Sequence, residues 1–126
     1  MLPEWTVVGF SGHRKLAGPQ AVAEGIQKVL ARLKADCNPL AAISSAASGA
    51  DTLFVEAIAA LKLPRLLILP FPAERFRQDF SSDEWERIWP HIQDATHVEE
   101  IAGEETDEQA YMETGIVTVD RSDVMI

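Results

Sequence analysis

Residues suited to binding an anion follow the first apolar stretch of the chain. In "VVGFSGHRKL", residues 7–16, hydrophobic residues give way to glycine, serine, histidine, arginine and lysine. Glycine and serine leave backbone N–H groups accessible, and the planar guanidinium of Arg14 matches the oxygens of a phosphate group. The glycines also suit a tight turn, which is compatible with this role. We therefore predict one wall of a phosphate-binding site, formed by Gly9, Ser11, Gly12, His13 and Arg14.

A second group of small polar residues follows the next apolar stretch, in "ISSAASGAD", residues 43–51. Ser48 and Asp51 have the spacing of a capping box, with Ser48 as the N-cap of a helix. A helix amino end that contains a glycine is also an anion site, because its first N–H groups point outward. The residues predicted to form this second wall are Ser45, Ser48, Gly49, Ala50 and Asp51.

A third polar segment, "LPFPAERFRQDF" at residues 69–80, follows another apolar run. It combines an aromatic side chain, Phe71, with several charged side chains, among them Arg77. Together, these three segments predict a ligand site assembled from loops.

Strands and helices must position these loops. Along the sequence, short apolar runs alternate with segments of helical periodicity, a pattern typical of βαβ units. We predict a Rossmann-like α/β domain of three layers, with a mostly parallel sheet of about five strands flanked by helices. Ligands of such sheets bind beyond the carboxyl ends of the strands, so the three loops meet at one edge. Strands are expected at residues 5–10, 40–44, 65–69, 96–101 and 123–126. Helices are expected after Gly18-Pro19, over residues 48–61, from Ser81 with Glu84, and from Thr106 with Gln109.

Composition limits the classes of function. A chain of 126 residues fits one domain, residues 1–126, and its net charge of -9 argues against general binding to nucleic acid. Its apolar runs are too short to span a membrane, and its single cysteine, Cys37, fits a reducing cytoplasm. We therefore expect a cytoplasmic protein with a small anionic ligand, without membrane insertion.

The sequence lacks the motifs of several common classes of enzyme and binding site. The first strand is followed neither by G-x-G-x-x-G nor by a Walker A sequence, and "GFSGH" lacks the spacing of a nucleophile elbow. His13, His91 and His97 have no metal-ligand spacing with Cys37 or with one another. The sequence thus predicts neither a metal nor a cofactor.

Four separated segments resemble the SLOG superfamily, which includes the DNA-processing protein DprA, the LOG enzymes and the amino-terminal domain of TRPM channels. "GFSGHRKL" and "SGAD" are similar to the "TGHR" and "EGAD" motifs of its bacterial branch, and "LPFPAERFRQDF" to its third-strand loop. "AYMETGIVTVDRSDVMI", residues 110–126, resembles its next helix and strand. The resemblance implies a domain that binds or senses a nucleotide derivative such as ADP-ribose or a nucleoside phosphate.

The resemblance also implies roles for individual residues. Gly12, His13 and Arg14 would contact phosphate or ribose, and Ser48, Gly49 and Asp51 would form the opposite wall. Phe71 would flank a base, with Arg77 and Asp79 near the rim.

Because the sequence departs from the family pattern in two ways, two alternative functions stay open. A serine precedes Gly49 where the family commonly has an acidic residue, and the sequence stops before the "AVWDG" and "GGT" segments, so we expect a shortened domain. One alternative is a LOG-like hydrolase of the N-glycosidic bond in nucleoside monophosphates, with Asp51, Glu74 or Glu113 as acid, base or charge stabiliser. The other is a non-catalytic assembly domain, in which the apolar end at residues 124–126 favours a homo-oligomer.

Overall fold

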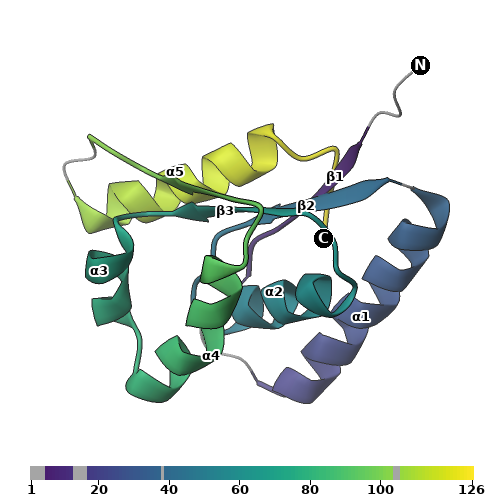
Figure 1. Ribbon diagram of the computed structural model, residues 1–126, viewed down its shortest axis with the longest axis horizontal. Helices are drawn as coiled ribbons and strands as arrows, with labels where there is room; N and C mark the ends of the chain where they lie inside the picture. Colours follow the sequence, from purple (N-terminus) through teal and green to yellow (C-terminus); the bar gives the residue numbers. More distant parts are fainter. Residues whose placement is uncertain (1–4, 13–16, 38, 104–105) are drawn as a thin grey trace.

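Five parallel strands form one sheet in the order β4-β3-β2-β1-β5. The computed structural model describes residues 5–12, 17–37, 39–103 and 106–126. In Figure 1 the helix α5 covers one face of the sheet, while α1, α2, α3 and α4 lie on the other. The predicted fold class, a Rossmann-like three-layer α/β domain, is confirmed. The strands are β1 (Thr6–Phe10), β2 (Leu40–Ser44), β3 (Arg65–Leu69), β4 (His97–Glu100) and β5 (Val124–Met125).

At least one helix connects each strand to the next along the chain, as parallel strands require. Four of the predicted helical regions are confirmed, and a short helical segment after β3 was not predicted. The helices are α1 (Pro19–Asp36), α2 (Ala50–Ala60), α3 (Ala73–Phe76), the 3₁₀ helix η1 (Arg77–Asp79), α4 (Ser82–Gln93) and α5 (Asp107–Asp120).

Two of the helix starts follow directly from local sequence. At α4 the Ser81 hydroxyl accepts a hydrogen bond from Glu84 N at 3.2 Å, and the Glu84 carboxylate accepts one from Ser81 N at 2.8 Å. Thr106 and Gln109 make the same reciprocal pair at the start of α5. Each pair satisfies two backbone N–H groups that would otherwise lack a partner at the start of the helix.

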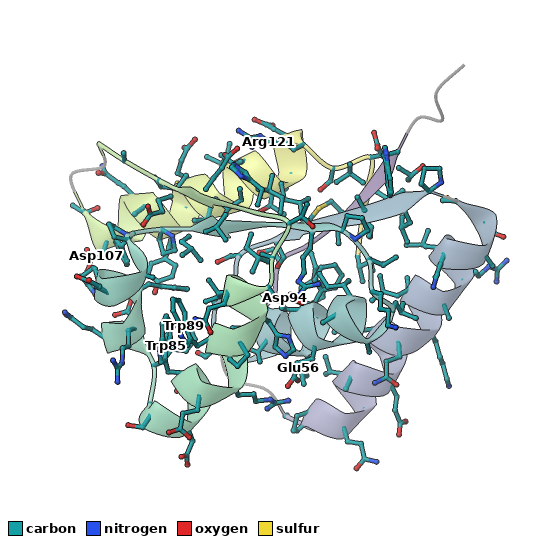
Figure 2. All side chains as sticks on the ribbon, viewed as in Figure 1. Glu56, Trp85, Trp89, Asp94, Asp107 and Arg121 are labelled. Carbon is teal, nitrogen blue, oxygen red and sulfur yellow. The ribbon has the colours of Figure 1, made fainter. Side chains whose placement is uncertain are left out.

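The helix-rich face of the sheet carries the hydrophobic core. Phe10 of β1 stacks on Phe54 of α2 with ring centroids 4.9 Å apart, and both are buried. A second cluster joins β3 to α4, where Trp85 and Trp89 stack at 5.3 Å (Figure 2). The tryptophan pair therefore serves packing, and the first cluster packs α2 against β1 and β2.

The side of helix α5 that packs on the sheet carries small residues. Ala110, Thr114 and Thr118 are buried, and both threonine hydroxyls donate to carbonyls of their own helix at 2.7 Å. Because these hydroxyls are already satisfied, their burial carries little cost and the helix can lie close to the strands. The large apolar residues of α5 face outward instead, with exposed fractions of 62% for Met112, 45% for Ile116 and 54% for Val119.

Candidate functional site

The loop after β1 contacts the amino end of α2. Gly12 N–H donates a hydrogen bond of 3.1 Å to Asp51 Oδ1 across 39 residues of sequence. A methyl group on Gly12 would lie 2.5 Å from Ala50 Cβ and 2.9 Å from the Phe10 ring. A residue without a side chain is therefore required for this close approach. The two segments predicted to form opposite walls of a site are neighbours in the fold.

The amino end of α2 is built differently from the prediction. The expected capping box with Ser48 as N-cap is wrong, because the helix begins at Ala50 and Gly49 is the N-cap. Gly49 has φ +86° and ψ -130°, a conformation that favours glycine. Asp51 accepts the Gly12 hydrogen bond, and Thr52 donates its hydroxyl to Ala47 O at 2.8 Å. Among the described residues, none caps α2 with its side chain.

The Gly12–Asp51 contact closes one side of a small cavity, which we call the central hollow. Its volume is about 130 Å³, and it lies at the carboxyl ends of β1 and β2 between α2 and α5. Parallel α/β sheets bind their ligands at this end. The residues that line the hollow are Phe10, Ser11, Gly12, Ser45, Ala47, Asp51, Tyr111, Thr114, Gly115 and Thr118.

Two buried polar side chains distinguish the central hollow from an ordinary packing defect. Asp51 is 4% exposed and Ser45 is 9% exposed. Within the part of the chain that the structure describes, Ser45 Oγ has no hydrogen-bond partner. The neighbouring Ser44 hydroxyl, by contrast, donates to Ser45 O at 2.7 Å. Since buried hydroxyls are normally paired, Ser45 marks a position where a further group is expected.

A second cavity, the flanking hollow, lies on the other side of the first turn of α2. It has a volume of about 200 Å³ and is lined by Pro19, Ser48, Gly49, Thr52, Leu53, Glu84 and Arg87. Arg87 Nε donates to Glu56 Oε2 at 2.7 Å, and a second bond joins its Nη2 to Glu56 Oε1. These hydrogen bonds raise the pKa of Arg87 above its ordinary value. The guanidinium that lines this hollow is therefore paired with Glu56.

The loop after β3 is joined to α5 by an aromatic and charged cluster. The Arg75 guanidinium lies 4.5 Å from the centroid of the Phe71 ring, and Tyr111 meets Phe71 edge to face at 5.5 Å. Tyr111 donates its hydroxyl hydrogen to Asp79, and Arg75 bonds both Asp79 and Asp107. Figure 2 labels Asp107 at the end of α5 nearest α3. Tyr111 thus belongs to this cluster and to the wall of the central hollow.

The structure brings some of the predicted site residues together. Ser11, Gly12, Ser45 and Asp51 line the central hollow, and Ala50 packs under Gly12. Ser48 and Gly49 line the flanking hollow instead. The second predicted wall is therefore divided by the first turn of α2.

Other predicted residues lie elsewhere. Gly9 is inside β1, where a methyl group would lie 1.9 Å from Ser122 Oγ, so its missing side chain serves packing. Phe71 lines a separate hollow of about 140 Å³ at the ends of β3 and β4. Arg77 is exposed on η1 and lines none of these three hollows. His13 and Arg14 lie outside the described residues.

Sequence reasoning missed the contribution of α5. Its inner side supplies Tyr111, Thr114, Gly115 and Thr118 to the central hollow. The signal was present, because these residues share one side of a helix at spacings of three and four. The larger apolar residues Met112, Ile116 and Val119 lie on the opposite, exposed side of α5.

Comparison with known protein families gives no match, and comparison with curated proteins gives none. Within the described ranges, no helix has the length and apolar character needed to cross a membrane. Histidine, cysteine and acidic residues of the same ranges nowhere gather in a group of three able to hold a metal ion.

Proposed function

We propose that this domain binds a nucleoside phosphate or a related nucleotide derivative at the carboxyl end of its sheet. The observation that carries the proposal is the Gly12–Asp51 contact, which closes a hollow containing the buried hydroxyl of Ser45. No other group of the described residues forms a hydrogen bond with that hydroxyl. The amino end of α2 lies beside the hollow, and no side chain of the described residues caps it. Helix amino ends carry a partial positive charge and outward N–H groups that favour an anion. The resemblance of the loop sequences to the SLOG superfamily supports the same class of ligand and a sensing role. The single cysteine, Cys37, fits a cytoplasmic location.

The size of the central hollow limits how such a ligand binds. Pockets that enclose a whole small molecule measure about 300–1,000 Å³, whereas this hollow measures about 130 Å³. One part of the ligand fits inside, and the remainder extends along the edge of the sheet. Arg14, two residues after Gly12 in the sequence, stays in the proposal as a phosphate contact.

Titration calorimetry with AMP, ADP, ADP-ribose and inorganic phosphate tests the proposal. Ser45→Ala removes the buried hydroxyl from the hollow and is expected to weaken nucleotide binding by about five- to tenfold, the value of one neutral hydrogen bond. Ser82→Ala, at the exposed start of α4, is the matched control and should leave affinity unchanged. If no nucleotide of the panel binds the unmodified protein at millimolar concentration, the proposal is wrong.

The alternative, a hydrolase of the N-glycosidic bond, is supported by a single observation. Of the three carboxylates considered for it, Asp51 lines the central hollow, whereas Glu74 and Glu113 do not. A buried carboxylate can stabilise positive charge that develops on a sugar ring. Incubation with nucleoside monophosphates should then release free base, detected by chromatography, and Asp51→Asn should abolish the release. Absence of product at high protein concentration leaves the binding function.

A further inference from the structure

We infer that Gly115 on α5 provides space in the central hollow for the part of the nucleotide that the hollow encloses. This inference rests on the proposed function and identifies a residue that limits the size of the bound group. Gly115 lies in the interior of α5, which extends from Asp107 to Asp120, and it lines the hollow together with Thr114 and Thr118.

The conformation of the chain does not require glycine at position 115. Among the described residues, the glycines with positive φ are Gly18, Gly49 and Gly103, so Gly115 has the backbone conformation of an ordinary helical residue. Inside an α-helix glycine is less favourable than alanine, because it loses more conformational freedom on folding. The sequence therefore has at this position a residue that lowers the stability of the helix.

Packing does not require glycine at position 115 either. Apart from its chain neighbours and the backbone of its own helix, no described atom lies within 4 Å of a methyl group added there. At Gly9 and Gly12, by contrast, the added methyl would lie 1.9 Å and 2.5 Å from the nearest atom. Those two glycines allow close contacts between segments. Because Gly115 lines the central hollow, the space that its missing side chain leaves adjoins that hollow.

A second observation points to a ligand in the same hollow. Ser45 is only 9% exposed, and among the described residues its hydroxyl has no hydrogen-bond partner. Ser45 follows β2 and Gly115 belongs to α5, and both line this hollow of about 130 Å³. A serine hydroxyl can donate or accept. A bound group can therefore form a hydrogen bond with Ser45 while it packs against the backbone of α5 at Gly115.

The test compares Gly115→Ala with Gly25→Ala by thermal unfolding and by titration calorimetry with AMP, ADP and ADP-ribose. Gly25 is the matched control because it also lies inside a helix, α1, with no described atom within 4 Å of an added methyl group. It is exposed, and it lines neither the central nor the flanking hollow.

We expect both variants to raise the midpoint of thermal unfolding by about 2–4 °C, because alanine favours a helix more than glycine does. Gly115→Ala should weaken nucleotide binding by about 10- to 100-fold, since the methyl group overpacks the occupied hollow. Gly25→Ala should leave the affinity unchanged. Gly115→Leu, which keeps a good helix former but fills more of the hollow, should remain folded and show no measurable binding.

A double-mutant cycle tests whether one bound group contacts both residues. Ser45→Ala should have a smaller effect on affinity in Gly115→Ala than in the unmodified protein, because a displaced group no longer reaches the hydroxyl. Additive effects of the two substitutions would overturn the shared contact.

The outcomes distinguish this inference from the proposed function. If nucleotides bind the unmodified protein and Gly115→Ala with equal affinity, the inference is wrong and nucleotide binding stands. A lower midpoint of unfolding in Gly115→Ala also overturns the inference, because the glycine would then serve packing. Equal weakening by Gly25→Ala would do the same. If none of the three nucleotides binds the unmodified protein at millimolar concentration, the inference and the proposed function are both wrong.

Discussion

The hydroxyl of Tyr111 on α5 donates a hydrogen bond to the carboxylate of Asp79 on η1. Asp79 also accepts from Arg75 at 3.2 Å, and Arg75 in turn bonds Asp107 at the start of α5. The loop after β3 and the helix on the opposite face of the sheet are thereby joined. Because Tyr111 also lines the central hollow, this connection fixes the position of one wall of the proposed site.

We expect Tyr111→Phe to destabilise the fold and to weaken nucleotide binding. Loss of a hydrogen bond to a charged group costs about 1.5–3 kcal/mol, and the free energy of unfolding in urea measures it. A double-mutant cycle with Asp79→Ala tests the coupling of the two side chains. Additive effects of the two substitutions would contradict the connection.

Gly12→Ala is expected to destabilise the protein by about 1–3 kcal/mol, as overpacking does. The added methyl would lie 2.5 Å from Ala50 Cβ, so the loop after β1 would have to move away from α2. Gly25→Ala is the matched control, because no atom of the described residues lies within 4 Å of the added group. In the interior of α1, alanine should stabilise by about 0.5–1 kcal/mol. A stabilising Gly12→Ala would show that the two walls are not in contact.

The exposed apolar residues of α5 predict self-association. Met112, Ile116 and Val119 share the outer side of the helix at spacings of four and three, and each is more than 40% exposed. We expect the mass measured by light scattering to rise with concentration, and Ile116→Glu to abolish the rise. Val29→Glu, on the exposed side of α1, is the control. A mass that stays monomeric at all concentrations would contradict the prediction, as would equal effects of the two variants.

The ion pair between Glu99 and Arg121 predicts a small dependence of stability on pH. The hydrogen bond from Arg121 at 2.7 Å lowers the pKa of Glu99 below the ordinary value of 4.5. A lowered pKa in the folded state means that the contribution is complete above the unfolded pKa and is lost as the pH falls through the folded one. Both groups are partly exposed, so Glu99→Gln should cost less than about 1 kcal/mol at pH 7.

That difference between Glu99→Gln and the unmodified protein should disappear on acidification below pH 4.5, as measured by urea unfolding at several pH values. Arg32→Gln, which removes a longer and more exposed pair with Asp36, is the control and should change stability little at any pH. An equal cost at pH 3 and pH 7 would contradict the assignment.

Local signals were sufficient for most of the fold. The apolar runs at residues 5–10, 40–44 and 65–69 predict three strands, and β1, β2 and β3 lie there. Ser81 with Glu84 marks the start of α4 because its capping bonds are made within four residues. Such interactions need no information from the rest of the chain.

The details of the site depend on contacts between distant segments. The start of α2 was placed incorrectly because Asp51 bonds Gly12, 39 residues away, and does not return to Ser48. The orientation of α5 depends on how closely Thr114 and Thr118 can approach the sheet, which hydrophobicity does not indicate. Parallel strand topology predicts that the loops lie at one edge of the sheet. Which side chains face the same hollow depends on the packing of the helices.

The glycine at the start of α2 has a consequence for evolution of the domain. At φ +86° a bulkier residue at position 49 would be strained, and the serine, threonine or aspartate that usually shields a helix start would be disfavoured there. The bare backbone at this point is therefore maintained by the conformation of the chain itself. In the proposed site, substitutions of the surrounding side chains would then change selectivity while the backbone at the start of α2 stays the same.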